Sequence, residues 1–162
     1  MENIRIKDME EIERILECVH DQYFDMDEIK HDKLSGTVSI QIPAYSRKSK
    51  VVKRILFINI WESINFQSVL VFHNVTDLEI SDRAEIGGAD INIIVQENDW
   101  LIVKCCIPVE IKMRVESIDI ELIFSDEIAP SERGYDYSFR SKLGITRSYK
   151  NYSFIKVKNP WS

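Results

Sequence analysis

The most constraining feature of the sequence is a change of phase in the apolar pattern of residues 109–124, VEIKMRVESIDIELIF. In the first half every second residue is apolar, from Val109 to Val115. Both halves can bury their apolar residues only if the chain bulges or bends at residues 116–117, because a one-residue slip exchanges the faces of a strand. Such bends carry a strand from one sheet of a β-sandwich to the other. The pattern therefore predicts a mainly β fold, an antiparallel β-sandwich or flattened barrel with bent strands. The apolar set of the second half is Ile118, Ile120, Leu122 and Phe124.

The same pattern occurs forty residues earlier in the chain. VTDLEI at 75–80 matches VESIDI at 115–120 position by position. The sequence has no third copy, which argues against a repeat protein. We therefore expect two structurally equivalent bent strands, which are candidates for neighbours in the fold. In this alignment His73 takes the place of Met113, so His73 is expected to be a core or half-buried histidine.

Residues 7–20 have the periodicity of an amphipathic helix, with Asp8 as the expected N-cap. After this single N-terminal α-helix, residues 24–33 and 37–42 are expected to form a hairpin, and Pro43 is expected to end its second strand. The run VVKRILFINIW that follows is apolar at both odd and even positions after its basic pair, which predicts a strand buried on both faces. Further strands are expected at 69–72, 91–95 and 100–106.

The 162 residues, of which 44% are hydrophobic and 30% charged, are typical of one soluble domain. We predict a helix at 7–20, an antiparallel β body at 24–126 and a basic, aromatic tail at 127–162.

The tail has seven Lys or Arg against three acids, a net charge of +4, whereas residues 1–126 have 14 against 24, a net charge of −10. An acidic body repels phosphate, which disfavours nucleic acid as its partner. The tail is expected to dock on the body of the same chain or of a homodimer mate.

Three cysteines form an odd set without the spacing of metal ligands, which is typical of reduced thiols in a cytoplasmic protein. Cys105 and Cys106 are adjacent on a predicted strand, so they should point to opposite faces as small buried hydrophobes. The N-terminal MENIRIKDMEEIERI has no apolar core of a signal peptide, and the apolar runs are too short to span a membrane. No membrane partner and no cofactor are therefore expected.

The stretch LECVHDQYFDMDEIKHD at 16–32 raises the possibility of a divalent metal site. His20, Asp21, His31 and Asp32 are the candidate ligands, and a metal-assisted hydrolase is one functional alternative. The acids do not have the spacing or the glycine of a calcium loop. A structural interpretation also accounts for these residues, with His20 at the C-terminus of the helix and outward acids protecting an edge strand.

A basic loop follows the first predicted hairpin and is the second candidate site. It predicts an anion-binding or partner-docking surface, with ion pairing to the acidic N-terminal region as the structural alternative. The three tryptophans, Trp61, Trp100 and Trp161, offer a possible sugar-stacking platform, so a carbohydrate-binding β-sandwich is a further alternative. The basic residues of the loop are Arg47, Lys48, Lys50, Lys53 and Arg54.

No set of residues with the spacing of a catalytic triad or a phosphate-binding loop is found in the sequence, so it gives no positive indication of an enzyme. A short acidic helix followed by a bent-stranded β domain resembles small bacterial proteins, immunity proteins among them, although no motif singles out one family. The sequence therefore favours a non-enzymatic binding module, immunity- or inhibitor-like, that presents an acidic surface to a basic protein partner.

Overall fold

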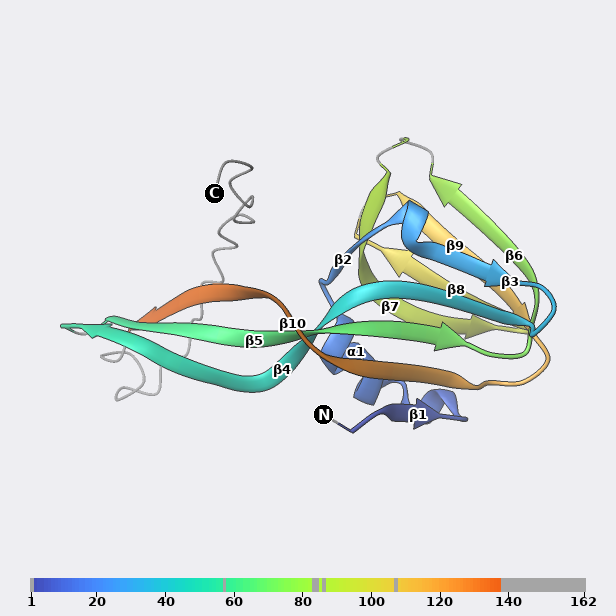
Figure 1. Cartoon of the computed structure of the whole chain (residues 1–162). Coiled ribbons are helices and arrows are strands. Elements are labelled where there is room, and N and C mark those ends of the chain that lie inside the picture. The colour runs from blue at the N-terminus through green and yellow to red at the C-terminus, as the bar shows by residue number, and fades with distance from the viewer. Residues whose placement is uncertain (1, 57, 83–84, 86, 107, 138–162) are drawn as a thin grey trace. The chain divides into compact units, whose positions relative to one another are not determined.

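The computed structural model describes residues 2–56, 58–82, 85, 87–106 and 108–137 (Figure 1). At 45–50, 61, 63–64, 128 and 130–137 it describes the backbone alone. Within these residues the fold is mainly β with one N-terminal α-helix, as predicted. No helix of the described part is long and apolar enough to cross a bilayer.

The helical elements are the 3-10 helices η1 (Met9–Glu11) and η2 (Met26–Glu28) and the α-helix α1 (Glu13–Val19). The strands are β1 (Ile4–Ile6), β2 (Tyr23–Asp25), β3 (Ile29–Asp32), β4 (Thr37–Ile55), β5 (Ile58–Phe72), β6 (Val75–Asp82), β7 (Gly88–Glu97), β8 (Trp100–Cys105), β9 (Val109–Val115) and β10 (Ile120–Tyr137). They form two five-stranded sheets, in the orders β1-β10-β5-β4-β3 and β2-β7-β8-β9-β6.

The chain divides into two compact units. The first unit consists of residues 1–44 and 66–127, and the second of 45–65 and 128–162. Three strands, β4, β5 and β10, each contribute residues to both units. The second unit thus combines the predicted tail with a segment that sequence reasoning assigns to the body.

The bend predicted in residues 109–124 is the point where the chain passes between the two sheets. β9 ends at Val115 in one sheet, and β10 begins at Ile120 in the other. Both apolar sets are inward: all four apolar residues of β9 are buried, and so are Ile120 and Leu122, while Ile118 and Phe124 are partly buried. The change of phase thus marks a bend at which both apolar sets stay buried, as the sequence predicts.

The second copy of the pattern crosses between the sheets beside the first. β6 pairs with β9 in antiparallel register, with Val75 opposite Val115, the two residues that match in the sequence repeat. The backbone N–H of His73 donates to the carbonyl of Asp119 at 2.9 Å, and that of Glu116 donates to the carbonyl of Asn74 at 3.1 Å. The two crossings are therefore neighbours with local two-fold character. His73 is half-buried, as predicted.

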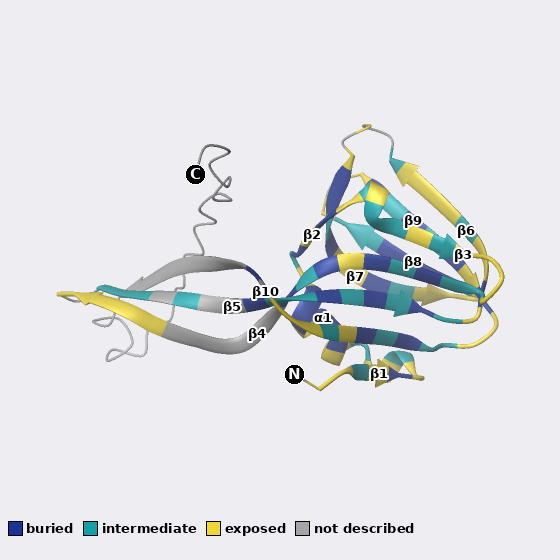
Figure 2. Cartoon of the chain, in the orientation of Figure 1, coloured by how far each residue is buried: buried dark blue, intermediate teal, exposed yellow. Residues whose placement is uncertain are grey.

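One continuous core fills the first unit and takes side chains from both sheets and from α1 (Figure 2). Its largest fully buried members include Phe24 and Phe72, one from each sheet. Burial of an aliphatic or aromatic side chain of this size stabilises the folded state by about 1.5–3 kcal/mol. The helical contribution consists of Ile15, Leu16, Cys18 and Val19.

The N-terminal region is predicted correctly, with differences in detail. The side chain of Asp8 accepts a hydrogen bond from the N–H of Glu10 at 3.0 Å, as an N-cap does, but the first turn is 3-10 rather than α-helical. The hairpin is present as β3 and β4, with Asp32 paired to Thr37. Its expected first residues instead form β2, which pairs with β7 in the other sheet.

The segment 51–61 differs from the prediction of a strand buried on both faces. β4 continues past Pro43 to Ile55, and the far end of this strand is exposed (Figure 2). After the basic pair, Ile55 and Leu56 keep 42% and 92% of their accessible surface. An unbroken apolar run shows which residues could be buried, but burial requires a second layer, and the described side chains of this segment do not join the core cluster.

A bidentate ion pair fixes the edge strand β1 to β10. Arg5 donates from Nε and Nη2 to the two carboxylate oxygens of Asp119, both at 2.7 Å. Sequence alternation predicts that Asp119 faces water, yet its side chain keeps 12% of its surface. The hydrogen bond from Arg5 lowers the pKa of Asp119, although burial opposes the shift. Asp119 therefore has a structural role, as the partner of Arg5 in this ion pair.

Val115→Asp and Ile120→Asp should each destabilise the protein by more than about 3 kcal/mol, because each variant buries an unpaired charge on one side of the crossing. Lys112→Ala, at a half-exposed position of β9, should stay within about 0.5 kcal/mol of the parent. Urea denaturation measures the three values. Tolerance of Asp at either apolar position would show that one set is not buried.

Asp119→Asn should lower the free energy of unfolding at neutral pH by more than Lys112→Ala does, because the pair with Arg5 loses its charge. The lowered pKa means that the pair stabilises the fold above pH 3.8 and that this stabilisation is lost as the pH falls through the folded-state pKa. The difference between parent and variant should therefore shrink in acid. Equal stability of both proteins at pH 7 would contradict a structural role.

Candidate binding groove

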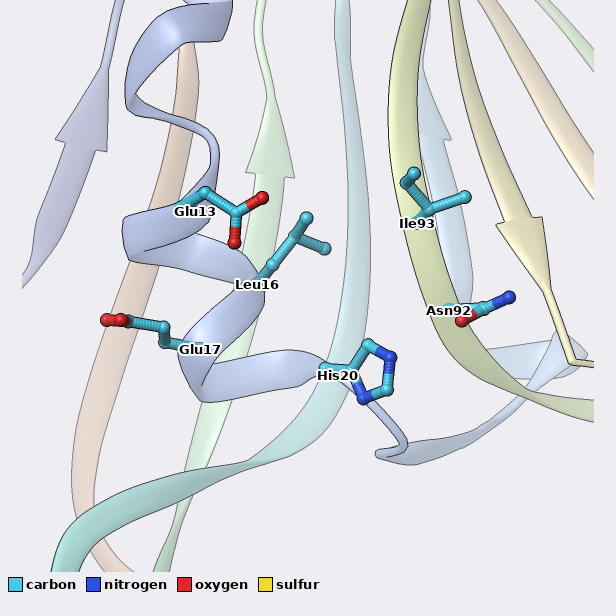
Figure 3. A pocket seen from close by; sticks show the side chains of 6 residues that line it. All are labelled: Glu13, Leu16, Glu17, His20, Asn92 and Ile93. Atoms are coloured by element: carbon cyan, nitrogen blue, oxygen red, sulfur yellow. The ribbon is translucent and has the colours of Figure 1, made fainter.

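An open groove of about 420 Å³ lies between α1 and β7 in the first unit (Figure 3). Figure 3 shows Leu16 pointing from the helix toward the strand and His20 at the end of the helix on the side of Asn92. The helix thus provides one wall and the strand the other. The lining residues are Glu13, Leu16, Glu17, His20, Asn92 and Ile93.

A β-bulge shapes the strand wall of the groove. The register of β7 against β8 shifts between Ile91 and Ile93, so Asn92 and Ile93 are both exposed, while Ile91 and Ile94 are both buried. An extra residue in one strand redirects the side chains that follow it. Ile93, which keeps 41% of its surface, becomes part of the groove instead of the core.

The helix wall ends in a turn that is hydrogen-bonded to the same part of β7. The N–H of Asp21 donates to the carbonyl of Ile91 at 2.8 Å, and the N–H of Ile91 donates to the carbonyl of Gln22 at 3.2 Å. Asp21 has φ of 60°, a left-handed conformation that Asp tolerates better than most residues and that commonly ends helices. These bonds hold His20, the C-cap, at the end of the groove.

The groove has an apolar floor and an acidic rim. Leu16 and Ile93 supply the aliphatic surface, and Glu13 and Glu17 are exposed carboxylates on α1, with Glu17 pointing away from β7 (Figure 3). Such a surface suits an aliphatic side chain flanked by cations, because it combines apolar contact with charge complementarity. Sequence reasoning singles out His20 from this set. In a regular strand, Ile93 and Ile94 would point to opposite faces, so they could not both be buried in one core. This adjacent apolar pair is the sequence signal that could have indicated the bulge.

A second cluster of ionisable groups surrounds the turn after α1. The thiol of Cys106 donates to Asp21 Oδ1 at 3.9 Å, and the N–H of Cys106 donates to the carbonyl of Asp90 at 3.2 Å. Burial, and then the charge of Asp21, raise the pKa of Asp90. Burial, followed by Cys106 and Asp90, raises the pKa of Cys105 to about 12. This thiol therefore stays protonated at neutral pH, which disfavours a nucleophilic role.

The cysteines differ from the expectation of a buried pair. Cys18 is buried, but Cys105 is half-buried and Cys106 is exposed; all three are free thiols. The reason is position: β8 ends at Cys105, so Cys106 already lies in the connection to β9. Desolvation, followed by the charges of Asp21 and Asp90, also raises the pKa of Cys106.

The four candidate metal ligands lie in two separate segments, with His20 paired to Asp21 and with His31 and Asp32 at the end of β3. His20 Nδ1 lies 3.1 Å from Asp21 Oδ2 at the end of α1, whereas His31 is on β3, opposite Val38 of β4. Asp32 closes the β3–β4 turn, where it accepts hydrogen bonds from the Ser35 hydroxyl and from backbone N–H groups that lower its pKa. Among the described residues no group of three or more His, Cys, Asp or Glu side chains is placed to hold a metal ion. The metal-assisted hydrolase stays a prediction.

The basic candidates, which the sequence predicts in a loop, lie instead in strand β4 within the second unit. Lys53 and Arg54 are exposed, and the side chains of Arg47, Lys48 and Lys50 lie outside the described ones. Of the tryptophans, Trp100 is half-exposed, and the guanidinium of Arg114 stacks 4.8 Å from its ring centre. The side chain of Trp61 and the whole of Trp161 fall outside the described part, so the sugar platform stays a prediction.

Comparison with protein-family models, with curated proteins and with solved structures finds no match for the chain. The geometry and charge of the groove are therefore the observations from which a function can be proposed.

Asp90→Asn should raise the free energy of unfolding at pH 7. The raised pKa means that the folded state disfavours the carboxylate, so its charge costs stability as the pH rises from 3.8 through the folded-state pKa. The gain should fade below pH 3.8, as measured by urea denaturation across pH. Asp126→Asn, at an exposed position of β10, is the matched control and should change little. A loss of stability at neutral pH in Asp90→Asn would contradict the burial of this carboxyl.

Proposed function

We propose that this protein is a non-enzymatic binding module whose acidic groove engages a basic segment of a protein partner, as immunity proteins and inhibitors do. The observation that carries the proposal is the segregation of charge between the two units. The first unit has 24 Asp or Glu against 9 Lys or Arg, a net charge of −15, and the second has 12 Lys or Arg against 3 acids, a net charge of +9. The groove lies in the acidic unit.

The net charges of the two units affect association with other molecules more than they affect the fold. A surface of one sign attracts partners of the opposite sign and accelerates encounter, and salt screens the attraction over about 8 Å at physiological ionic strength. The apolar floor, formed by Leu16 and Ile93, adds contact that salt does not weaken. A basic partner with an aliphatic anchor fits both properties.

The exposure of the groove supports binding over catalysis. Glu13, Glu17 and His20 are all solvent-exposed. General acid–base catalysis near neutral pH usually depends on burial that tunes the catalytic group. Glu13 and Glu17 are not buried, and exposed carboxylates are suited to pairing with cations at a rim.

Affinity capture with matched variants tests the proposal. Immobilised parent protein should retain a basic protein that elutes as the salt concentration rises. Glu13→Gln/Glu17→Gln should lose this partner because the rim charge is removed. Glu79→Gln/Glu116→Gln removes the same charge from exposed positions at the β6 end of the sheet and should retain it. Mass spectrometry of the eluates identifies the partner.

Equal retention by the parent and by the groove variant would show that the groove is not the binding site. Metal analysis of the purified protein addresses the hydrolase alternative. Stoichiometric bound metal that is lost in both His20→Ala and His31→Ala would favour the hydrolase over the binding module.

A further inference from the structure

The end of the β4–β5 hairpin exposes apolar side chains in the second unit. The β4–β5 tip, defined as residues 51–56, has four exposed aliphatic residues: Val51 at 44%, Val52 at 44%, Ile55 at 42% and Leu56 at 92% of their accessible surface. Clustered apolar residues at an exposed site are typical of interaction surfaces, whereas single ones are common everywhere. The tip is therefore a candidate interaction surface.

The conformation of Leu56 adds to this indication. Its φ is 53°, in the left-handed region that glycine, asparagine and aspartate usually occupy in turns. A leucine at this point is unfavourable for the backbone and gains nothing from burial within the described chain, since it keeps 92% of its surface. Contact with another molecule would give this residue a physical role.

The charge of the tip defines the chemistry of its partner. Lys53 and Arg54 are exposed between the aliphatic residues. The sequence has no Asp or Glu between Asp32 and Glu62, and the second unit carries +9. The partner surface must therefore combine an apolar contact with negative charge.

We propose that the β4–β5 tip of one copy binds the groove between α1 and β7 of a second copy of this chain. This inference rests on the proposed function of the groove and names its basic partner. Leu56 would contact the floor formed by Leu16 and Ile93, and Lys53 and Arg54 would pair with the glutamates of the rim. Reciprocal exchange gives a two-fold dimer with two identical contacts, each of which raises the effective concentration of the other.

Charge favours a second copy over an anionic lipid surface as the partner. The chain carries a net charge of −6, and the first unit −15, so an anionic bilayer repels most of the molecule. The acidic groove attracts the tip without this opposition. Tip and groove are also present in equal amounts in every preparation of the protein.

A charge-exchange experiment tests the dimer with the full chain. The parent should be dimeric at low salt by analytical ultracentrifugation and should dissociate as the salt concentration rises. Lys53→Glu/Arg54→Glu and Glu13→Lys/Glu17→Lys should each be monomeric, because tip and groove then carry like charges. An equimolar mixture of the two variants should recover the dimer, since each tip again meets a groove of opposite sign.

Two controls separate specific contact from general charge effects. Glu79→Lys/Glu116→Lys changes the net charge as the groove variant does, at exposed positions outside the groove, and should leave the dimer intact. Leu56→Ser should weaken the dimer at least about tenfold while its charge is unchanged, because it removes the aliphatic anchor. Circular dichroism should show the same β content in all variants.

Several outcomes would overturn the inference. They are a monomeric parent at low salt, a dimer that survives reversal of either charge pair, and a mixture of the two variants that stays monomeric. Binding of a monomeric parent to vesicles of phosphatidylcholine and phosphatidylserine, lost in Lys53→Glu/Arg54→Glu, would assign the tip to a membrane surface instead. A monomeric parent whose groove still captures a basic protein would leave the proposed function standing and remove only this inference.

Discussion

The paired crossings at Val75 and Val115 are the constraint on which the rest of the first unit depends. At this point β5 leads into β6 and β9 leads into β10, and the two connections are joined by backbone hydrogen bonds through His73 and Glu116. Because each crossing moves the chain from one sheet to the other, both sheets can place their apolar faces toward one core. A register slip at either crossing would turn the buried set of the following strand outward.

The groove also depends on the register of a strand. A single bulge in β7 exposes Ile93 and Asn92 next to α1, and the turn after the helix bonds to the residue that precedes the bulge. The site is thus built where the end of a helix meets an irregular strand. Bulges commonly redirect side chains at functional sites in this way.

Because charge is segregated between the two units, the acidic unit favours cationic partners and the basic unit favours anionic ones. The acidic unit holds a groove with an aliphatic floor, and the basic unit holds a hairpin tip with aliphatic side chains. A different basic protein would therefore compete with the tip of a second copy for the same groove. The concentration of the protein and the salt concentration would then decide between them, because both contacts have an electrostatic component.

The sequence by itself determined the local features of this protein. The apolar phase of residues 109–124 predicts the crossing, and Asp8 predicts the helix cap. These features depend on side-chain alternation and on residues within a few positions of one another, so they can be read from the chain without knowing its partners in space.

Only the tertiary structure decided which residues share a surface. Sequence reasoning groups His20 with His31 by proximity in the chain, whereas the fold places His20 at the end of α1 beside Asn92 and His31 on β3. The same reasoning buries residues 51–61, since an apolar run does not state whether a second layer covers it. Whether a residue is buried, and which residues meet in one site, depends on how the sheets pack. The reason is that a core or a groove is formed between elements that are distant in the sequence.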